Sequence, residues 1–292
     1  MEIQKLSLQQ FKKMAKLVYD RTGIHMPEEK ISMLSNRLRR RLKALSLDSF
    51  DAYYKFLSSP KGCDEELPNF LSAVTTNETY FFRNEQLWKF IQDDLIKHWV
   101  ETKTQGAKSI RIWSSASSSG EEAYTAAIVL REHLPKFDDW SITIVGSDIS
   151  KKVLDKASAA IYNDYAVAKM SKAQVRRWFT KKDDDFQLVD DVRKMVRFQS
   201  HNLRDPFPSG RFDLVFLRNV LMYFDTPMKK TVITNVSNAV APGGHMIVGD
   251  VDPIRTIAEL SACMTLDYQR PGVYHKPTGR KAEEKTKKLV TM

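Results

Sequence analysis

The sequence predicts a two-domain α/β protein, with a small helical domain at the N-terminus and a doubly wound sheet domain after it. Its 292 residues are about twice the usual size of one domain, and 42% hydrophobic with 28% charged residues is an ordinary globular composition. Apolar residues recur at helical spacing up to residue 57, whereas beyond residue 105 short apolar runs alternate with helix-like segments. This change of pattern indicates two domains, which we place at residues 1–74 and 75–275.

Helices are expected in the first part of the chain, where apolar residues are spaced three or four apart. The apolar stripes cover residues 11–18, 33–45 and 50–57, and they are separated by breaks at 23–27 and 46–49. Pro60, Gly62 and Pro68 then predict a linker or boundary around residues 59–75.

Strands and helices are expected to alternate in the second part of the chain. Strands are predicted at residues 109–113, 140–146, 212–217 and 245–248, with helices at 121–134, 153–161 and 228–240. Such alternation is typical of a parallel sheet that binds its ligand at the carboxyl ends of the strands. A turn at Asp183–Asp185 between two β-like runs predicts a small antiparallel insertion at about 178–199. The basic tail, 276–292, has little to bury and is expected to be mobile.

The net charge of +10 and the pI of about 9.4 suggest an acidic partner, such as nucleic acid, anionic lipid or an acidic protein surface. The excess lies outside residues 75–275, which hold 27 basic and 25 acidic residues. The spacing of Cys63 and Cys263 fits neither a disulfide framework nor a metal site, which favours a reducing compartment. With no signal-peptide pattern and no apolar run of about 18 residues, we expect a cytoplasmic protein without membrane insertion.

A serine-rich turn is expected between the first strand and the following helix, at residues 114–122. Its small residues, among them Ser117 and Gly120, would let the backbone approach a ligand, and hydroxyls with free helix N-terminal amides can hold an anionic group. The alternative is a simple turn in which Glu121 and Glu122 favour the helix dipole.

Asp148 stands at the carboxyl end of the second predicted strand. An acidic side chain there can accept hydrogen bonds from the ribose hydroxyls of a nucleoside cofactor. It can equally cap the helix that follows.

Two further segments combine polar and aromatic residues. The segment 75–83 (TTNETYFFR) runs from a polar cluster into an aromatic triplet that ends in Arg83, and it could instead be an amphipathic packing segment. The segment 212–224 leads from a buried strand into Arg218, Asn219 and Tyr223, and it could instead be a strand followed by a capped helix.

Five motifs in this order resemble the CheR family of chemotaxis receptor glutamate methyltransferases: TTNETYFFR, SSSGEEAY, SDIS, HNL (201–203) and FDLVFLRNVLMYF. The resemblance extends to about residue 275. It implies a Rossmann-like domain that transfers the methyl group of S-adenosylmethionine to glutamate side chains of chemoreceptors, with S-adenosylhomocysteine as product. A glutamate side chain is ionised at neutral pH and needs no general base.

The resemblance also implies which residues form the site. For the catalytic step it suggests Arg83, which would orient the incoming carboxylate, and Tyr223, which would shape the transfer site. The positions implied for cofactor binding are Asn77, Thr79, Arg83, Ser117, Gly120, Glu121, Glu122, Asp148, Asn202, Leu203, Arg218 and Asn219.

Partners follow from the same resemblance. The family's corresponding helix faces the acidic methylation region of the receptor, so Arg37, Arg39, Arg40 and Arg41 are implied to dock on the cytoplasmic helices of chemoreceptors, although a solvated basic face is the alternative. The insertion matches a β-subdomain that in some members binds a receptor's C-terminal peptide. We expect a monomer that binds neither metal nor nucleic acid.

The chain departs from the family pattern after the Pro-Gly-Gly turn, where Gly249–Pro253 (GDVDP) replaces the usual GHSE, and SGEEAYT replaces TGEEPYS. A non-catalytic module that binds S-adenosylmethionine is therefore an alternative function. A nucleic-acid methyltransferase is the less favoured alternative, because the chain has no Asn/Asp-Pro-Pro-aromatic motif and no cysteine in a motif region.

Overall fold

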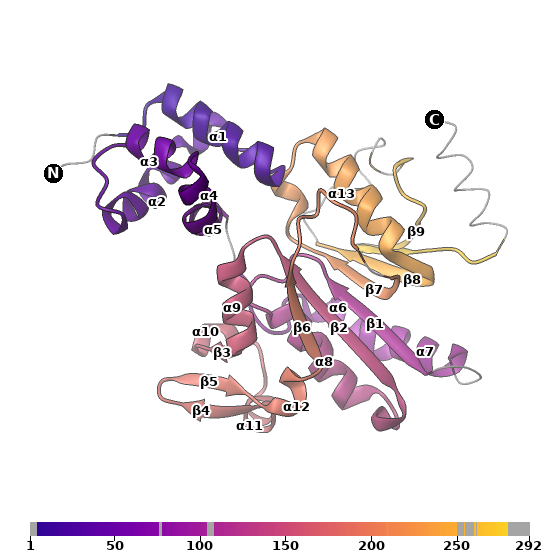
Figure 1. Cartoon of the computed structure of the whole chain (residues 1–292). Coiled ribbons are helices and arrows are strands. Elements are labelled where there is room, and N and C mark those ends of the chain that lie inside the picture. The colour runs from indigo at the N-terminus through magenta and orange to yellow at the C-terminus, as the bar shows by residue number, and fades with distance from the viewer. Residues whose placement is uncertain are drawn as a thin grey trace.

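The structure is a computed structural model that describes residues 5–75, 78–103, 108–208, 210–249, 254, 260 and 262–279. Three of the expectations above lie outside these residues: the site residue Asn77, the divergent segment 250–253, and the tail from residue 280 onward. Helices α1 to α5 form a domain beside the sheet domain (Figure 1).

The N-terminal domain is built from five helices around one apolar core. The helices are α1 (Leu8–Thr22), α2 (Ile31–Ala44, preceded by the short 3₁₀ helix η1, Glu28–Lys30), α3 (Phe50–Leu57), α4 (Pro60–Glu65) and α5 (Leu67–Val74). Ser7 begins α1 with a capping box, and Gly23 ends it in a left-handed conformation (φ 76°). The predicted breaks at 23–27 and 46–49 are confirmed, because both separate helices.

The stretch 59–75, predicted as a linker or boundary, is not a linker, because α4 and α5 occupy it as far as Val74. Pro60 and Pro68 each stand in the first turn of a helix, where a missing amide hydrogen costs nothing. Phe70 and Val74 of α5 are buried in the core of the helical domain. The prolines therefore begin helices and do not mark a linker.

A seven-stranded sheet forms the second domain, in the order β6-β2-β1-β7-β8-β10-β9. The first five strands in this order are parallel and the last two are antiparallel. Their bounds are β1 (Ser109–Ser114), β2 (Ser141–Asp148), β6 (Val196–Ser200), β7 (Phe212–Leu217), β8 (Val240–Val248), β9 (Asp267–Arg270) and β10 (Val273–His275). The predicted strands and the doubly wound architecture are confirmed.

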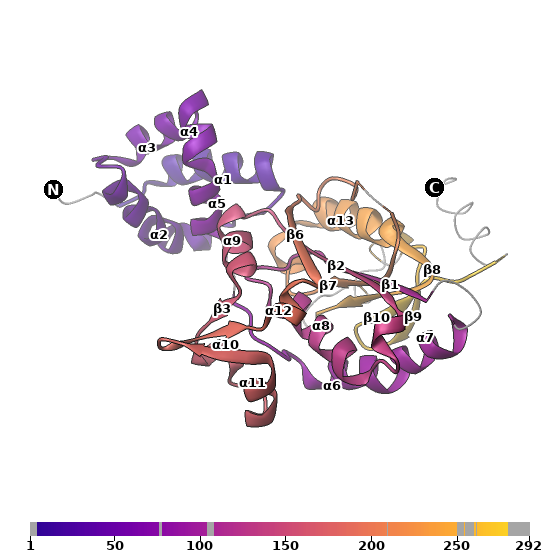
Figure 2. The same ribbon diagram turned by 60° about the horizontal axis from the view of Figure 1, so that its bottom comes forward.

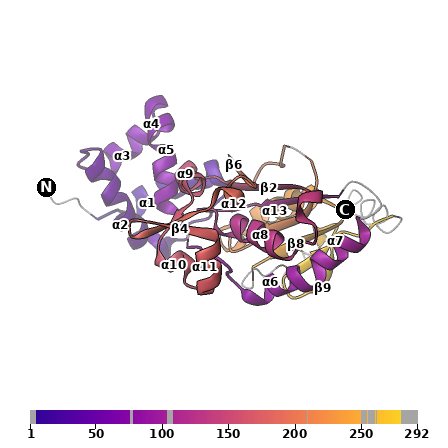
Figure 3. The same cartoon turned by 90° about the horizontal axis from the view of Figure 1, so that it is seen from below.

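Helices cover both faces of this sheet, so its central strands β1 and β7 are largely buried (Figure 2). One face is covered by α6 (Glu85–Phe90), the π-helical turn η2 (Ile91–Leu95), α7 (Ile96–Thr102) and α8 (Glu121–His133), which lie together in Figure 3. The other face is covered by α13 (Thr226–Ala239). Successive side chains of β1 point to opposite faces of the sheet: Ile112 packs in the core under α6, α7 and α8, and Trp113 packs in the core under α13. The remaining short elements are η3 (Phe137–Asp139), α9 (Lys151–Ala159) and η4 (Leu221–Tyr223).

The predicted antiparallel insertion is present, but it ends before residue 196 and not at about 199. Its three strands have the order β3-β5-β4, and Asp183 (φ 53°) makes the turn between β4 and β5. The residues from 196 onward belong instead to β6, which pairs in parallel with β2 of the main sheet. Helix α9 lies between this insertion and α5 (Figure 1). The bounds are β3 (Ile161–Tyr162), α10 (Asp164–Val167), α11 (Lys172–Trp178), β4 (Phe179–Lys182), β5 (Asp185–Leu188) and α12 (Asp190–Arg193).

The mobile tail was predicted to begin at residue 276, but this residue is part of the folded sheet domain. Lys276 is buried, and its ammonium group donates hydrogen bonds to the backbone carbonyls of Ser237 and Val240 at 3.0 and 2.9 Å. These carbonyls lie where α13 ends, and Lys276 adds a cationic donor to acceptors at this helix terminus.

The end of α1 is joined directly to the sheet domain. The side-chain amide of Asn202 donates to the carbonyl of Arg21 (3.0 Å), and Arg204 donates to the carbonyl of Asp20 (2.7 Å). Ile24 forms an isolated antiparallel bridge with Phe224. The segment that follows α1 is therefore part of the surface around the carboxyl edge of the sheet. None of the helices in the described parts of the chain has the length and apolar character to cross a membrane.

Candidate functional site

A cleft lies where β1, β2 and β7 end and where the segment after α1 meets them. The space between its lining atoms, including the part that is open to solvent, is about 960 Å³. Residues from both domains line it, including Thr22 and Ile24 from the helical domain and Ser117, Asp148 and Arg218 from the sheet domain. The predicted position at the carboxyl edge of the sheet is confirmed.

The serine-rich turn lines the cleft through Ser117 and Ser118, whereas Gly120 only shapes the turn. Ser118 and Gly120 have φ values of 47° and 95°, so the backbone reverses sharply before α8. A β-carbon at Gly120 would lie 2.9 Å from the Ala157 β-carbon and 2.9 Å from the Phe198 ring. Gly120 therefore has no room for a side chain, and the cofactor role implied for it stays a prediction.

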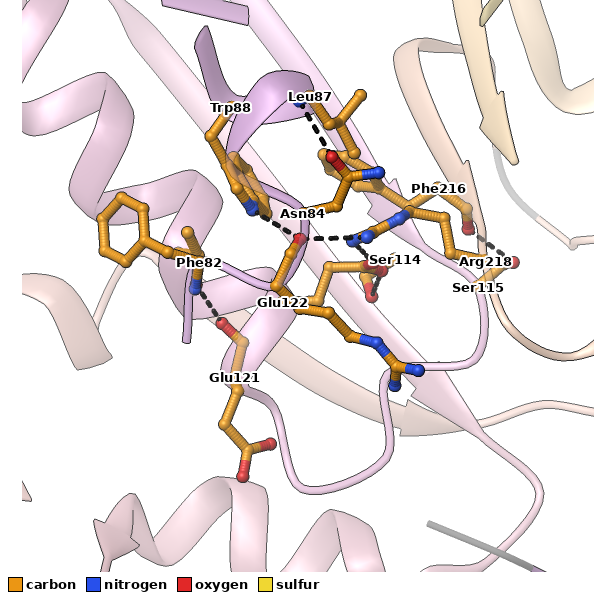
Figure 4. Close-up of polar contacts among 12 residues, drawn as sticks. Phe82, Asn84, Leu87, Trp88, Ser114, Ser115, Glu121, Glu122, Phe216 and Arg218 are labelled. Carbon is orange, nitrogen blue, oxygen red and sulfur yellow. Dashed lines mark hydrogen bonds and ion pairs between the residues drawn. The ribbon is translucent and has the colours of Figure 1, made fainter. Parts of the chain in front are cut away.

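Glu121 and Glu122 have different surroundings, and only Glu122 lines the cleft. The carboxylate of Glu121 accepts from the Ser119 hydroxyl and points away from Glu122 in Figure 4. Burial raises the pKa of Glu121 to about 7. Glu121 lies outside the cleft lining because adjacent residues of a helix point about 100° apart, and the cofactor role implied for it stays a prediction.

Glu122 is part of a buried ion pair at the back of the cleft. Its carboxylate accepts from Arg218 at 2.8 Å and from the Ser114 hydroxyl at 2.7 Å. Arg218 also donates to the backbone carbonyl of Arg83 at 2.9 Å, and Trp88 donates to the same carbonyl at 3.1 Å (Figure 4). The Arg218 side chain is only 4% exposed, so this group connects β7, α8 and the segment before α6 rigidly.

Arg83 lies in a strained stretch of backbone. Phe82 and Asn84 on either side have φ values of 57° and 67°, a region that side chains other than glycine rarely adopt. The Phe82 amide is held by the hydroxyl of Thr125, and the side chain of Asn84 caps α6 at the Leu87 amide. These contacts maintain a conformation in which Arg83 lines the cleft.

Thr79 also lines the cleft, as does Asn219, whose backbone has a left-handed φ of 57° at the end of β7. The Arg83 guanidinium donates to the carbonyl of Glu78 at 2.8 Å and lies 5.7 Å from the centre of the Tyr80 ring. The structure therefore brings together the described members of the segment 75–83 and the end of β7, as predicted.

Asp148 lines the cleft and does not cap α9, whose N-cap residue is Ser150 and has no side-chain cap hydrogen bond. The oxygens of Asp148 accept from the backbone amides of Ser118 (3.0 Å) and Ser150 (2.9 Å). Burial raises the pKa of Asp148 above its usual value, although the amides act in the opposite direction. Because each carboxylate oxygen has a second lone pair, both can still accept from a ligand.

The segment 201–203 forms a wall of the cleft next to the helical domain. Leu203 is buried, and the side-chain amide of Asn202 donates its hydrogen bond to the carbonyl of Arg21. His201 was not singled out as a site residue, yet it lines the cleft with its ring packed edge-on against Trp113. Burial lowers the pKa of His201, which favours the neutral ring.

Tyr223 stands at the rim of the cleft, in η4. Its backbone carbonyl accepts from the His25 amide at 2.8 Å, and the ammonium group of Lys30 lies 5.7 Å from the centre of its ring. Thr22, Ile24, Trp88 and Phe224 also line the cleft and were not predicted.

The four arginines proposed for docking divide into two pairs. Arg41 is bound to the buried carboxylate of Glu66 by two hydrogen bonds, of 2.8 and 2.6 Å. Arg37 donates to carbonyls at the end of α5, among them that of Val74 at 3.1 Å. Both side chains hold α2 against the end of α5 and the residue between α4 and α5, and the docking role implied for them stays a prediction. Arg39 is partly exposed and Arg40 is exposed.

Several buried polar atoms of the cleft have no hydrogen-bond partner among the described residues. They are the Ser117 hydroxyl oxygen, Nε2 of His201 and Nε of Arg218. Together with the carboxylates of Asp148 and Glu122, they fit a ligand that carries hydroxyl groups at one end and a charged amino-acid group at the other. No set of three histidine, cysteine or acidic side chains in the described parts of the chain is arranged to hold a metal ion.

Comparison with known proteins gives matches over nearly the whole chain. A family model described as "CheR methyltransferase, SAM binding domain" matches residues 77–269, and one described as "CheR methyltransferase, all-alpha domain" matches residues 9–75. Chemotaxis protein methyltransferase 2 of Vibrio cholerae is 32% identical over 276 residues, covering 92% of this chain and 93% of the relative. Chemotaxis protein methyltransferase 2 of Pseudomonas aeruginosa is 33% identical, covering 82% and 84%. The chemotaxis protein methyltransferase of Salmonella typhimurium is 32% identical, covering 84% and 83%.

Proposed function

The chain belongs to the CheR methyltransferase family, and from this premise we propose that it transfers the methyl group of S-adenosylmethionine to glutamate side chains of chemoreceptors. The single observation that carries the proposal is the cleft at the carboxyl edge of the sheet. It has a buried Glu122–Arg218 pair at one position and Asp148 at another, with unpartnered polar atoms between the two domains.

The residues of the cleft suit the two ends of S-adenosylmethionine, which when bound supplies an electrophilic methyl group. Asp148 would accept hydrogen bonds from the ribose hydroxyls, because its carboxylate is held in place by two backbone amides. Glu122 and Arg218 would hold the charged amino-acid end, since they offer an acceptor and a donor fixed to each other. Asn202 and Leu203 would form the wall beside the base.

The acceptor needs orientation more than activation. A glutamate side chain has an ordinary pKa of about 4.3, so at neutral pH it is already the nucleophilic carboxylate. Holding that carboxylate in line with the methyl group is then the main contribution that the protein can make. Arg83 would orient the carboxylate through charge-assisted hydrogen bonds, and Tyr223 would shape the rim through which it enters.

Docking on the receptor would use the exposed side of α2. Arg40 is exposed and Arg39 is partly exposed, and neither forms an ion pair among the described residues that docking on an acidic helix would break. The acceptor would be the cytoplasmic part of the receptor, which places the protein in the cytoplasm.

The experiment is to incubate the protein with methyl-labelled S-adenosylmethionine and membranes that contain chemoreceptors. Label on the receptor that is released by mild base supports a glutamyl methyl ester. Label that resists base would show another acceptor atom, and label on added RNA would show a nucleic-acid methyltransferase. Binding of S-adenosylmethionine without any transfer would show a non-catalytic module, and each of these three results would contradict the proposal.

A further inference from the structure

The antiparallel insertion, from β3 to α12, contacts two segments that form the cleft, although none of its residues, all of which the structure describes, lines the cleft itself. The Tyr162 hydroxyl, in β3, donates to the backbone carbonyl of Ser119 at 2.8 Å, within the serine-rich turn. The carbonyl of Ala166, in α10, accepts from the backbone amide of Phe81 at 2.9 Å, within the segment 75–83. The insertion therefore supports both segments from outside the cleft.

Tyr162 is buried and contacts both of these segments. Its ring packs edge-on against the ring of Phe81, with the ring centres 4.9 Å apart, and Phe81 packs edge-on against Phe179 of β4 at 5.2 Å. A buried tyrosine hydroxyl needs a hydrogen-bond partner, and here the partner is the Ser119 carbonyl. Because the aromatic contacts lock the ring, the hydroxyl is held at one place relative to the serine-rich turn.

The serine-rich turn needs such support because its backbone is strained. Ser118 and Gly120, on either side of Ser119, have φ values of 47° and 95°, and a strained conformation persists only when its surroundings hold it. The amide of Ser118 donates to the Asp148 carboxylate at 3.0 Å. Since Ser118 and Ser119 are adjacent, a shift of the Ser119 carbonyl would also move the amide that holds Asp148.

We propose that Tyr162 is a positioning residue for cofactor binding, because its hydroxyl holds the serine-rich turn in the conformation that fixes the Asp148 carboxylate. This inference rests on the proposed function in that it needs the cleft to bind the S-adenosyl cofactor. The contacts run from the insertion through Ser119 and Ser118 to the residue proposed to accept the ribose hydroxyls. The insertion thus contributes to cofactor affinity through a residue that does not line the cleft.

Tyr124 offers a matched control for a purely structural role of Tyr162. It is also buried, its ring centre lies 6.4 Å from that of Tyr162, and its hydroxyl also donates to a backbone carbonyl, that of Ala157 at 2.9 Å. Ala157 belongs to α9 and not to the serine-rich turn. Tyr124→Phe and Tyr162→Phe therefore remove the same kind of hydrogen bond from neighbouring positions, and only Tyr162→Phe removes one from the turn.

The test measures the affinity for S-adenosylhomocysteine by calorimetry, which does not depend on methyl transfer. It compares the wild type with Tyr162→Phe, Tyr124→Phe, Asp148→Asn and the double variant of Tyr162→Phe with Asp148→Asn, which completes a double-mutant cycle. Urea unfolding gives the stability of each variant. Initial rates of base-labile methyl transfer to a chemoreceptor fragment give kcat and the KM for S-adenosylmethionine.

We expect Tyr162→Phe to weaken the binding of S-adenosylhomocysteine about fivefold, the equivalent of one hydrogen bond between uncharged groups. Tyr124→Phe should bind it as the wild type does, although both variants should lose similar stability in urea. When Asp148 is already Asn, Tyr162→Phe should weaken binding less than about twofold, because the carboxylate that the turn positions is gone. In the methyl-transfer assay Tyr162→Phe should raise the KM for S-adenosylmethionine and keep the wild-type kcat.

Wild-type affinity of Tyr162→Phe would overturn the inference and leave the proposed function intact. An equal loss of affinity in Tyr124→Phe would overturn it in favour of a structural role, and a fivefold loss that persists beside Asp148→Asn would show that Tyr162 does not act through Asp148. If the wild type itself binds no S-adenosylhomocysteine, the cofactor assignment fails, and the proposed function and this inference fail with it.

Discussion

Acidification is expected to destabilise the sheet domain through His245, a buried histidine of β8. The residue is 4% exposed, and its Nδ1 has no hydrogen-bond partner among the described residues. Its ring centre is 4.9 Å from that of His275 and 6.4 Å from that of His98. Burial, followed by these two neighbouring rings, lowers the pKa of His245 from 6.5 to about 4. The charged groups Asp94 and Arg270 form an ion pair nearby, at 3.7 Å.

The sign and size of the effect follow from this pKa. In the unfolded chain the ring takes up a proton near pH 6.5, whereas in the folded protein it stays neutral until about pH 4. The contribution to stability is therefore complete above pH 6.5 and is lost as the pH falls toward 4. A difference of about 2.5 pKa units corresponds to about 3 kcal/mol, of which about 2 kcal/mol is lost by pH 5.

Tryptophan fluorescence isolates the relevant domain, because all five tryptophans lie between residues 88 and 178. Urea unfolding at pH 7.5 and pH 5 gives the free energy of unfolding of the wild type and of His245→Gln. The variant has no titrating ring, so its stability relative to the wild type should increase by about 2 kcal/mol between the two pH values. His245→Asn should show the same increase, which separates the titration from the packing change. A difference between wild type and variants that stays constant with pH would refute the reasoning.

Other predictions concern docking, cofactor binding and transfer. Arg41→Met should lower the free energy of unfolding of the helical domain by about 3–5 kcal/mol, because it removes the ion-pair partner of the buried Glu66 carboxylate. Arg40→Met, at an exposed position, should change this free energy by less than about 0.5 kcal/mol. Far-UV circular dichroism in urea measures both variants, and equal effects would contradict the different surroundings assigned to the two arginines. Asp148→Asn should weaken binding of S-adenosylmethionine by about 2 kcal/mol in calorimetry, and wild-type affinity would exclude the ribose role. Arg83→Ala and Tyr223→Phe should lower turnover more than cofactor affinity, and unchanged turnover would exclude both assignments.

The carboxyl edge of the sheet was predictable because local signals coincide there. The apolar run 212–217 indicates a buried strand, and a parallel sheet brings the ends of such strands to one edge. Asp148, Arg218 and Asn219 could therefore be assigned to one site from the sequence. Glu121 and Glu122 could not be distinguished, because α8 is buried over most of its circumference and carries no single apolar stripe.

The difference between the inward-bound arginines of α2 and its more exposed arginines could have been predicted from the sequence. Leu34, Leu38 and Leu42 form the apolar stripe of α2, and Arg37 and Arg41 lie directly beside it, each three residues after one of these leucines. Long cationic side chains at the edge of an apolar stripe extend along the buried surface. The absence of acidic residues from residue 31 to 47 concealed this difference, because the partner carboxylate, Glu66, is on another helix.

The sequence contains no local pattern that predicts which residues of the helical domain line the cleft. Thr22 is the last residue of α1 and Ile24 follows it as part of an ordinary helix end. Their place in the cleft depends on contacts with residues about 200 positions later, such as the bridge between Ile24 and Phe224. Because one wall of the cleft comes from the helical domain, a ligand that fills the cleft is bound most tightly when both domains keep this arrangement. Binding of S-adenosylmethionine should therefore stabilise the contact between α1 and the sheet domain, and by linkage a receptor bound across that contact should bind the cofactor complex more tightly than the free protein.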